Sequence, residues 1–201
     1  MNHIRTLSLL YNSQFAHPTP IIVAWANVLT GATTPDTISA SLSVNGTVRA
    51  TRHWVGSDFS PGATRRLAMS YDALTDSTGL YPYVLTVTSK FNLAGVQKSS
   101  SVSGVRVIVN RSQSYYGAGW WLAGFERLYF PASDSTTRLW IGGDGSSRLY
   151  RKIATTTWAA PSLTRPDTIK WDGTQYVRYL PHGVRVLFNA AGLQTGTVDR
   201  L

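Results

Sequence analysis

Hydrophobic and polar residues alternate along the first half of the chain in short runs that are separated by turn residues, which is typical of β-strands. The clearest run covers residues 38–44 and meets Asn45-Gly46, a dipeptide that favours a type I′ hairpin turn. Residues 21–28 form a continuous apolar run, as expected of a strand buried on both faces. The other runs of this kind are residues 4–11, 47–54, 64–71, 81–89 and 104–109. About seven strands in this length predict a β-sandwich over residues 1–110.

The second half of the chain consists of shorter strand-like runs punctuated by glycine turns. These turns are Asp144-Gly145, Asp172-Gly173, His182-Gly183 and Ala191-Gly192. The regular spacing of the last three fits one strand and one turn of a β-meander, so neighbouring runs should pair as hairpins. A polar run at residues 110–114 separates the two halves, and we expect a second region over residues 115–201.

The composition supports an all-β fold. The chain has 201 residues, of which 43% are hydrophobic and 14% charged, as in a folded protein with a core. Glu occurs once, at Glu126, whereas Thr, Ser, Val, Tyr and Trp are abundant. Strong helix formers are therefore scarce and strand formers plentiful.

The formal net charge of +9 raises the question of a nucleic-acid partner. The basic residues are spread over both halves and nowhere do three adjoin, so solvated strand and turn positions explain them better. The chain has no cysteine, which excludes disulfides, thiolate metal sites and a cysteine nucleophile. No apolar run reaches the roughly 20 residues that span a bilayer, and the N-terminus is not a convincing signal peptide.

Three segments of the second half resemble the beginning of an RHS-repeat (YD-repeat) region. Residues 116–128 resemble its opening Gly-x-Gly-Trp segment, residues 139–150 its first hairpin, and residues 179–193 the repeat itself. The motif residues are Gly117, Gly119, Trp120, Trp121, Gly124, Trp140, Asp144, Gly145, Tyr150, Tyr179, Gly183, Phe188 and Gly192. The repeat departs from the family at Asn189, where Asp is usual, and at Leu193, where Arg is common.

Residues 79–87 also resemble a late strand of immunoglobulin-like and fibronectin-III-like modules. Together the resemblances imply a sandwich followed by the first hairpins of an RHS shell. They imply a non-catalytic entrance or plug region of a large bacterial protein, secreted or at the cell surface, whose shell encloses a C-terminal effector, often a toxin. The expected partners are then the rest of the same polypeptide, with further repeats and the effector, and we expect the chain to be a piece truncated at its C-terminus.

Isolated hairpins are marginally stable, so the second region needs neighbours to cover its apolar face. We expect one open sheet that has an apolar edge at its C-terminal end and self-associates. Large aromatic side chains should supply the buried area. They are Trp140, Tyr150, Trp171, Tyr176, Tyr179 and Phe188.

Catalytic and cofactor sites find no support in the sequence. The four histidines, His3, His17, His53 and His182, are widely separated, and no calcium-loop series of carboxylates is present. No pair of carboxylates stands out for glycoside hydrolysis, and residues 142–145 lack the Lys of a phosphate loop. We expect no enzyme activity, no metal and no cofactor.

The aromatic pairs Tyr115-Tyr116 and Trp120-Trp121 allow two interpretations. Buried, they would anchor the junction of the two regions, and the nearby glycines favour this. Exposed, they would stack on sugar rings or a partner surface, and the chain would be an adhesin-like module that binds a cell-surface glycan or protein.

Overall fold

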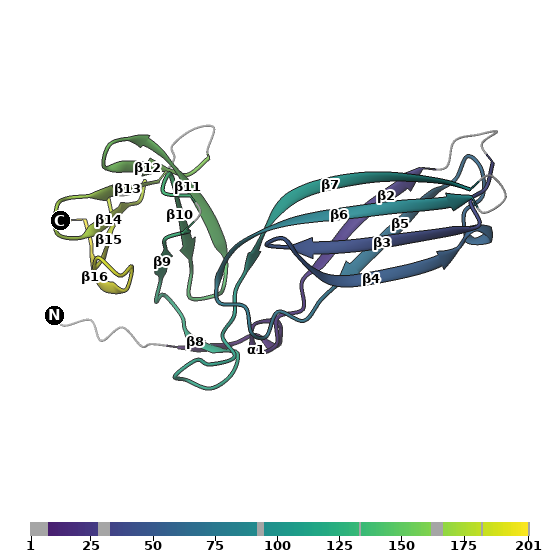
Figure 1. Ribbon diagram of the computed structural model, residues 1–201. Helices are drawn as coiled ribbons and strands as arrows, with labels where there is room; N and C mark the ends of the chain where they lie inside the picture. The colour runs from purple at the N-terminus through teal and green to yellow at the C-terminus, as the bar shows by residue number, and fades with distance from the viewer. Residues whose placement is uncertain are drawn as a thin grey trace. The chain divides into compact units, whose positions relative to one another are not determined.

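The computed structural model describes residues 8–27, 33–91, 95–132, 134–161, 167–181 and 183–200. Nearly all of its regular structure is antiparallel β-sheet, which confirms the all-β class (Figure 1). The chain divides into two compact units, each described by itself below. The sandwich unit consists of Pro18–Asp76 and Tyr81–Ile108, and the meander unit of Met1–His17, Ser77–Leu80 and Val109–Leu201.

Six strands form the sandwich unit. The smaller sheet pairs β2 (Ile21–Asn27) with β5 (Thr64–Ser70). The larger sheet has the order β4-β3-β6-β7. Its strands are β3 (Thr37–Val44), β4 (Thr47–Val55), β6 (Gly79–Phe91) and β7 (Val96–Ile108), and a short 3₁₀ helix, η1 (Gly56–Asp58), follows β4. The β2-β5 and β4-β3-β6-β7 pairings are those of immunoglobulin-like sandwiches that carry strand C′ beside C, F and G.

Period-two alternation builds the sandwich core. In β3 every second side chain is buried, from Ile38 to Val44, while the serines between them face outward. Leu42 packs in one apolar cluster with Met69 of β5 and Ile22 of β2, so the two sheets share a core. The turn after β3 has positive φ at both Asn45 (49°) and Gly46 (79°), as the predicted type I′ turn requires.

The meander unit contains an eight-stranded sheet whose strands follow one another in chain order, each antiparallel to the next. They are β9 (Arg127–Tyr129), β10 (Thr137–Ile141), β11 (Ser147–Ala154), β12 (Thr157–Ala159), β13 (Thr168–Trp171), β14 (Tyr176–Tyr179), β15 (Arg185–Phe188) and β16 (Gln194–Val198). A second, two-stranded sheet pairs β1 (Leu9–Tyr11) with β8 (Trp120–Leu122), and the single helical turn α1 (Ser13–Ala16) follows β1.

The structure differs from the sequence expectation at the N-terminus. The described part of the run at residues 4–11 is β1, which belongs to the meander unit through β8 and not to the sandwich. Asn12 N donates to Gly119 O (3.0 Å) and Ala123 N to Ser8 O (2.7 Å), which extends this pairing. Alternation specifies a strand but not its partner, so the sequence placed the strand in the nearer domain. Of the residues that the alternation predicts to face inward, Ile4 and Leu7 lie outside the described residues, and Leu9 is 50% exposed.

The eight-stranded sheet is also less open than expected, because it curls until its two ends meet. Leu128 N in β9 donates to Gly192 O (2.9 Å), and Arg127 and Leu193 form an antiparallel bridge. Leu128 of β9 and Phe188 of β15 consequently share one buried cluster with Tyr150 of β11, although β9 and β15 lie near opposite ends of the strand order. Glu126 N also donates to Gln194 Oε1 of β16 (2.5 Å), but among the described residues β16 has one strand neighbour, β15. The expectation of a fully open sheet was therefore wrong, because the curled sheet covers its own apolar face.

Within the described part of the chain, no helix has the length and apolar character needed to cross a membrane.

Candidate functional site

A cluster of charged side chains lies buried on the concave side of the meander sheet, centred on Arg178 of β14. Its Nη1 donates to Glu126 Oε1 and Oε2 at 2.9 and 2.8 Å, and its Nη2 donates to Asp167 Oδ2 at 2.6 Å. The Arg178 side chain is 6% exposed and that of Asp167 3%. Glu126 directly precedes β9 and Asp167 directly precedes β13, so the cluster joins distant parts of the sheet.

Tyr150 of β11 and Arg148 complete the surroundings of Asp167. The Tyr150 hydroxyl, fully buried, donates to Asp167 Oδ2 at 2.6 Å and accepts from Arg178 Nε at 2.9 Å. Arg148 Nη1 donates to Asp167 Oδ1 at 2.9 Å. Burial alone would raise the pKa of Asp167, but the bonds from Tyr150 and Arg178, the charge of Arg178 and the bond from Arg148 hold that pKa below its ordinary value. Burial and the bond to Asp167 raise the pKa of the Tyr150 phenol.

Trp140 of β10 covers the cluster. Its Nε1 donates to Glu126 Oε2 at 2.7 Å, and the Arg178 guanidinium lies 4.2 Å from the centre of its ring. Every carboxylate oxygen of Glu126 and Asp167 now accepts at least one hydrogen bond, and two arginines balance the two carboxylates. All four oxygens therefore have protein partners, which is the pattern of a structural network.

The sequence singled out only Trp140 and Tyr150 of this group. It missed Glu126, Arg148, Asp167 and Arg178 as members, because their separations along the chain follow no local spacing rule. One signal was present: Glu126 is the single Glu of the chain and lies in a segment that carries the RHS resemblance.

A second buried charge, Arg111, connects the turn at residues 142–143 with α1 and β8 of the meander unit. The side chain donates from Nη1 to Gly143 O (2.9 Å) and from Nη2 to Gly142 O (2.8 Å). The guanidinium lies 5.2 Å from the ring of Phe15 and 5.0 Å from that of Trp121. The pKa of the Arg111 guanidinium is lowered, and burial is the largest cause of this shift. The sequence did not single out Arg111, which lies in the polar run taken as a boundary.

The carboxylate of Asp144 has a structural role in the Gly-Asp-Gly-Ser turn that Arg111 contacts. Asp144 Oδ1 accepts from Ser146 N (2.9 Å) and Ser146 Oγ (2.6 Å), and these bonds lower the pKa of Asp144. Gly145, with φ of 85°, lies so close to Phe15 that an added Cβ would be 1.9 Å from the ring. The turn therefore packs against the α1 segment and needs a glycine at this position.

The two tryptophans of the Gly-x-Gly-Trp segment point to different surroundings. Trp121 is half-buried, and its Nε1 donates to Phe125 O at 2.9 Å. Trp120 is 39% exposed, and its ring lies 5.2 Å from that of Tyr11. Tyr115 is fully exposed and Tyr116 partly so. Burial of both pairs was the favoured interpretation, and it is wrong for Tyr115, Tyr116 and Trp120.

The other motif residues are structural. Phe188 is fully buried, whereas Tyr179 is 38% exposed beside Lys170. The predicted motif glycines all have positive φ. They are Gly117, Gly119, Gly124, Gly145, Gly183 and Gly192. Asn189 Oδ1 accepts from Ala191 N and Leu193 N (both 3.0 Å), so this asparagine holds the turn at Gly192.

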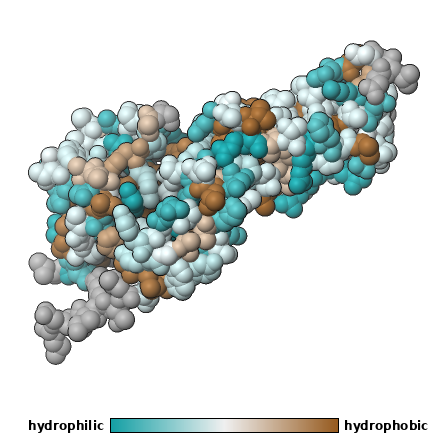
Figure 2. Space-filling model, turned by 60° about the horizontal axis from the view of Figure 1, so that its bottom comes forward, coloured by the Kyte–Doolittle hydropathy of each residue, from teal (hydrophilic) through white to brown (hydrophobic). Residues whose placement is uncertain are grey.

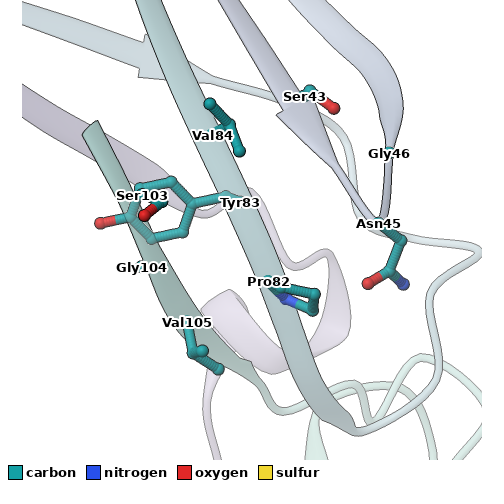
Figure 3. Close-up of a pocket in the computed structure, with 9 residues that line it drawn as sticks. All are labelled: Ser43, Asn45, Gly46, Pro82, Tyr83, Val84, Ser103, Gly104 and Val105. Atoms are coloured by element: carbon teal, nitrogen blue, oxygen red, sulfur yellow. The ribbon is translucent and has the colours of Figure 1, made fainter. Parts of the chain in front are cut away.

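A shallow depression of about 400 Å³ lies at one end of the sandwich unit (Figure 3). In the close-up the Tyr83 ring lies across β7 beside Ser103 and Gly104, and Val84 and Val105 extend from β6 and β7. Asn45 N donates to Pro82 O at 2.9 Å, which fixes the rim. The depression has hydroxyl and amide groups but no ionisable carboxylate or histidine, so it holds no catalytic pair.

Metal-ligand clusters are absent from the described residues: nowhere do three His, Asp or Glu side chains converge. His17 and His53 belong to different units, and His3 and His182 lie outside the described residues.

No protein-family model matches the chain, and no curated protein matches it in sequence.

Proposed function

We propose that the chain is a non-catalytic structural segment of a larger RHS-type protein, secreted or displayed at the cell surface, and that it forms the plug region of a β-shell around a C-terminal effector. The observation that carries the non-catalytic part is the cluster around Arg178. Glu126 and Asp167 accept hydrogen bonds from side chains of the same unit, which supports a structural role for these buried carboxylates.

The RHS part of the proposal rests on the three segments in the order expected of the family. The second segment forms the β10–β11 hairpin, and the third runs through β15 to the turn at Gly192. Because Gly192 already contacts β9, further hairpins would have to join the sheet along the outer edge of β16. The first part of such a shell would be the curled meander sheet, which covers its own apolar face.

The localisation and size follow from the same proposal and can be tested together. Antibodies raised against the 201-residue chain should detect, in cells that carry its gene, a polypeptide much larger than 22.0 kDa in the medium or on the surface. A 22 kDa species confined to the cell interior would contradict the proposal. A hydrolase activity that is lost in Asp144→Asn without unfolding would contradict its non-catalytic part.

A second candidate function is an adhesin-like module that binds a cell-surface glycan or protein. The observation that favours it is the exposed pair of tilted rings, Trp120 and Tyr11, with Tyr115 nearby in the chain and fully exposed, because exposed aromatic faces suit sugar rings. Glycan-array binding that Trp120→Ala abolishes, with the circular dichroism spectrum unchanged, would support it. The matched control is Tyr179→Ala, which alters an exposed aromatic side chain elsewhere in the same unit.

A further inference from the structure

One side of the sandwich is open between β2 and β7, the outer strands of the two sheets. Each has a single strand neighbour among the described residues, β5 for β2 and β6 for β7. A groove of about 360 Å³ lies between them, walled by Ala24 to Asn27 on one side and Lys98 to Val102 on the other. Leu67 and Leu85, both buried, form its floor.

The groove is about as long as a short β-strand, and an apolar side chain of β7 faces it. Five residues of β7 border it, which at about 3.3 Å per residue is roughly 16 Å, the length of a short β-strand. In β7, Ser101 and Ser99 pair with Thr86 and Thr88 of β6 on the outer face (2.8 Å each), so Val102 alternates to the groove side. Val102 is nevertheless 49% exposed, as a core position would be if one neighbour were lacking.

The edge strand β2 is poorly suited to remain uncovered. It has six apolar residues in succession, Ile21 to Ala26, and its outer-face members are exposed, with Trp25 at 66%. Bare apolar edge strands pair readily with other chains, and proteins usually protect them with charge, proline or a covering segment. On the face of the molecule drawn in Figure 2, hydrophobic residues lie among hydrophilic ones.

The charges around the groove identify the kind of segment that fits. The strands β2, β5 and β7 contain Arg65, Arg66, Lys98 and Arg106 but no Asp or Glu. Lys98 is the charged residue of the groove wall. Pairing two copies of this edge would place like charges close together, which is unfavourable, whereas a strand with carboxylates would be attracted.

We propose that the groove between β2 and β7 accepts an extended, acidic β-strand from a partner protein. The strand pairs with the main chain of β2, places alternate apolar side chains on Leu67 and Leu85, and directs a carboxylate toward Lys98. This inference rests on the sandwich unit and does not depend on the RHS proposal.

Two peptides test it on the whole chain: acetylated EVTVEVTVE, and KVTVKVTVK as the charge-reversed control. The acidic peptide should slow hydrogen exchange of the amides in residues 21–27 and 96–102, and the basic peptide should not. Equal protection by both peptides, or by neither, overturns the proposal.

Charge-reversal variants test the role of Lys98. Lys98→Glu should weaken binding of the acidic peptide about tenfold, because one attraction becomes a repulsion. Lys90→Glu is the matched control: it makes the same change at an exposed position of β6 outside the groove and should retain most of the binding. An equal loss in both variants indicates unspecific attraction to a basic protein and overturns the proposal.

Two other occupants have distinct outcomes. A chain that dimerises without peptide, with concentration-dependent protection of β2, would make a second copy the occupant. An oligosaccharide that protects β2 when neither peptide does, and that Trp25→Ala no longer binds, would make the groove a sugar site. Either result overturns the proposal. If Lys98→Glu does not fold, the exchange data on the unaltered chain still decide.

Discussion

The Nη1 atom of Arg178 donates to both carboxylate oxygens of Glu126, a residue 52 positions earlier in the chain. The pair joins the residue before β9 to the middle of β14 across the concave side of the curled sheet. Because Asp167 and Tyr150 bind the same guanidinium, one side chain holds three separate segments.

Removal of Arg178 should therefore be strongly destabilising. Arg178→Met leaves Glu126 and Asp167 with uncompensated buried charge, and breaking a buried pair in this way costs about 3–5 kcal/mol. Urea unfolding of the meander unit, followed by tryptophan fluorescence, measures the loss. The triple variant Arg178→Met, Glu126→Gln, Asp167→Asn removes both carboxylates and should recover part of it. A loss below about 1 kcal/mol in the single variant would contradict the structural role.

Asp167 should make the meander unit sensitive to acid. Its pKa is lowered in the folded state, so its contribution is present above the unfolded value of about 3.9 and is lost as pH falls through the lower folded pKa. Asp167→Asn should be less stable at pH 7 and lose less stability on acidification. Urea midpoints measured from neutral pH to about pH 2 test this. Asp58→Asn, an exposed carboxylate of the sandwich unit, is the control and should leave the curve unchanged.

Much of the sandwich could be predicted because its signals are local. The alternation of residues 38–44 gave β3, and Asn45-Gly46 gave both the turn and its positive φ values. The same reasoning failed for residues 9–11, whose alternation is as strand-like but whose partner, β8, is more than a hundred residues away. Register and partner are set by contacts that no short window contains.

The charged cluster was hidden for the same reason. Arg178 lies in a strand where Val177 and Arg178 are both buried, one on each face, which no amphipathic pattern predicts. Asp167 precedes β13, which pairs with β14, whereas Glu126 precedes β9 and approaches Arg178 only when the sheet curls. The glycine turns were visible in the sequence, but the curling that brings Gly192 to Leu128 was not.

Arg111 should not tolerate replacement by lysine. The guanidinium donates to Gly142 O and Gly143 O with two nitrogens and stacks near two rings, whereas an ammonium is a single point that cannot reproduce this fork. Arg111→Lys should lose about 1–3 kcal/mol of unfolding free energy, measured by urea titration. Arg151→Lys, an exposed position of β11 in the same unit, is the matched control and should change stability by less than about 0.5 kcal/mol. Equal stability of the two variants would show that the carbonyl contacts of Arg111 contribute little.

Closure of the meander sheet depends on the absence of a side chain at Gly192. Its φ is +78°, and a Cβ there would lie 2.1 Å from Leu128 O. Leu128 belongs to β9, the strand that completes the curl. Gly124→Ala is the matched control, since φ is +74° in the same unit but no atom lies within 4 Å of the added carbon.

The control should cost about 1–2 kcal/mol from backbone strain alone. Gly192→Ala should cost clearly more and should speed hydrogen exchange at the Leu128 amide, which donates to Gly192 O. Equal losses in the two variants, with the Leu128 amide still protected, would mean that the contact between β9 and the Gly192 turn does not hold the sheet closed.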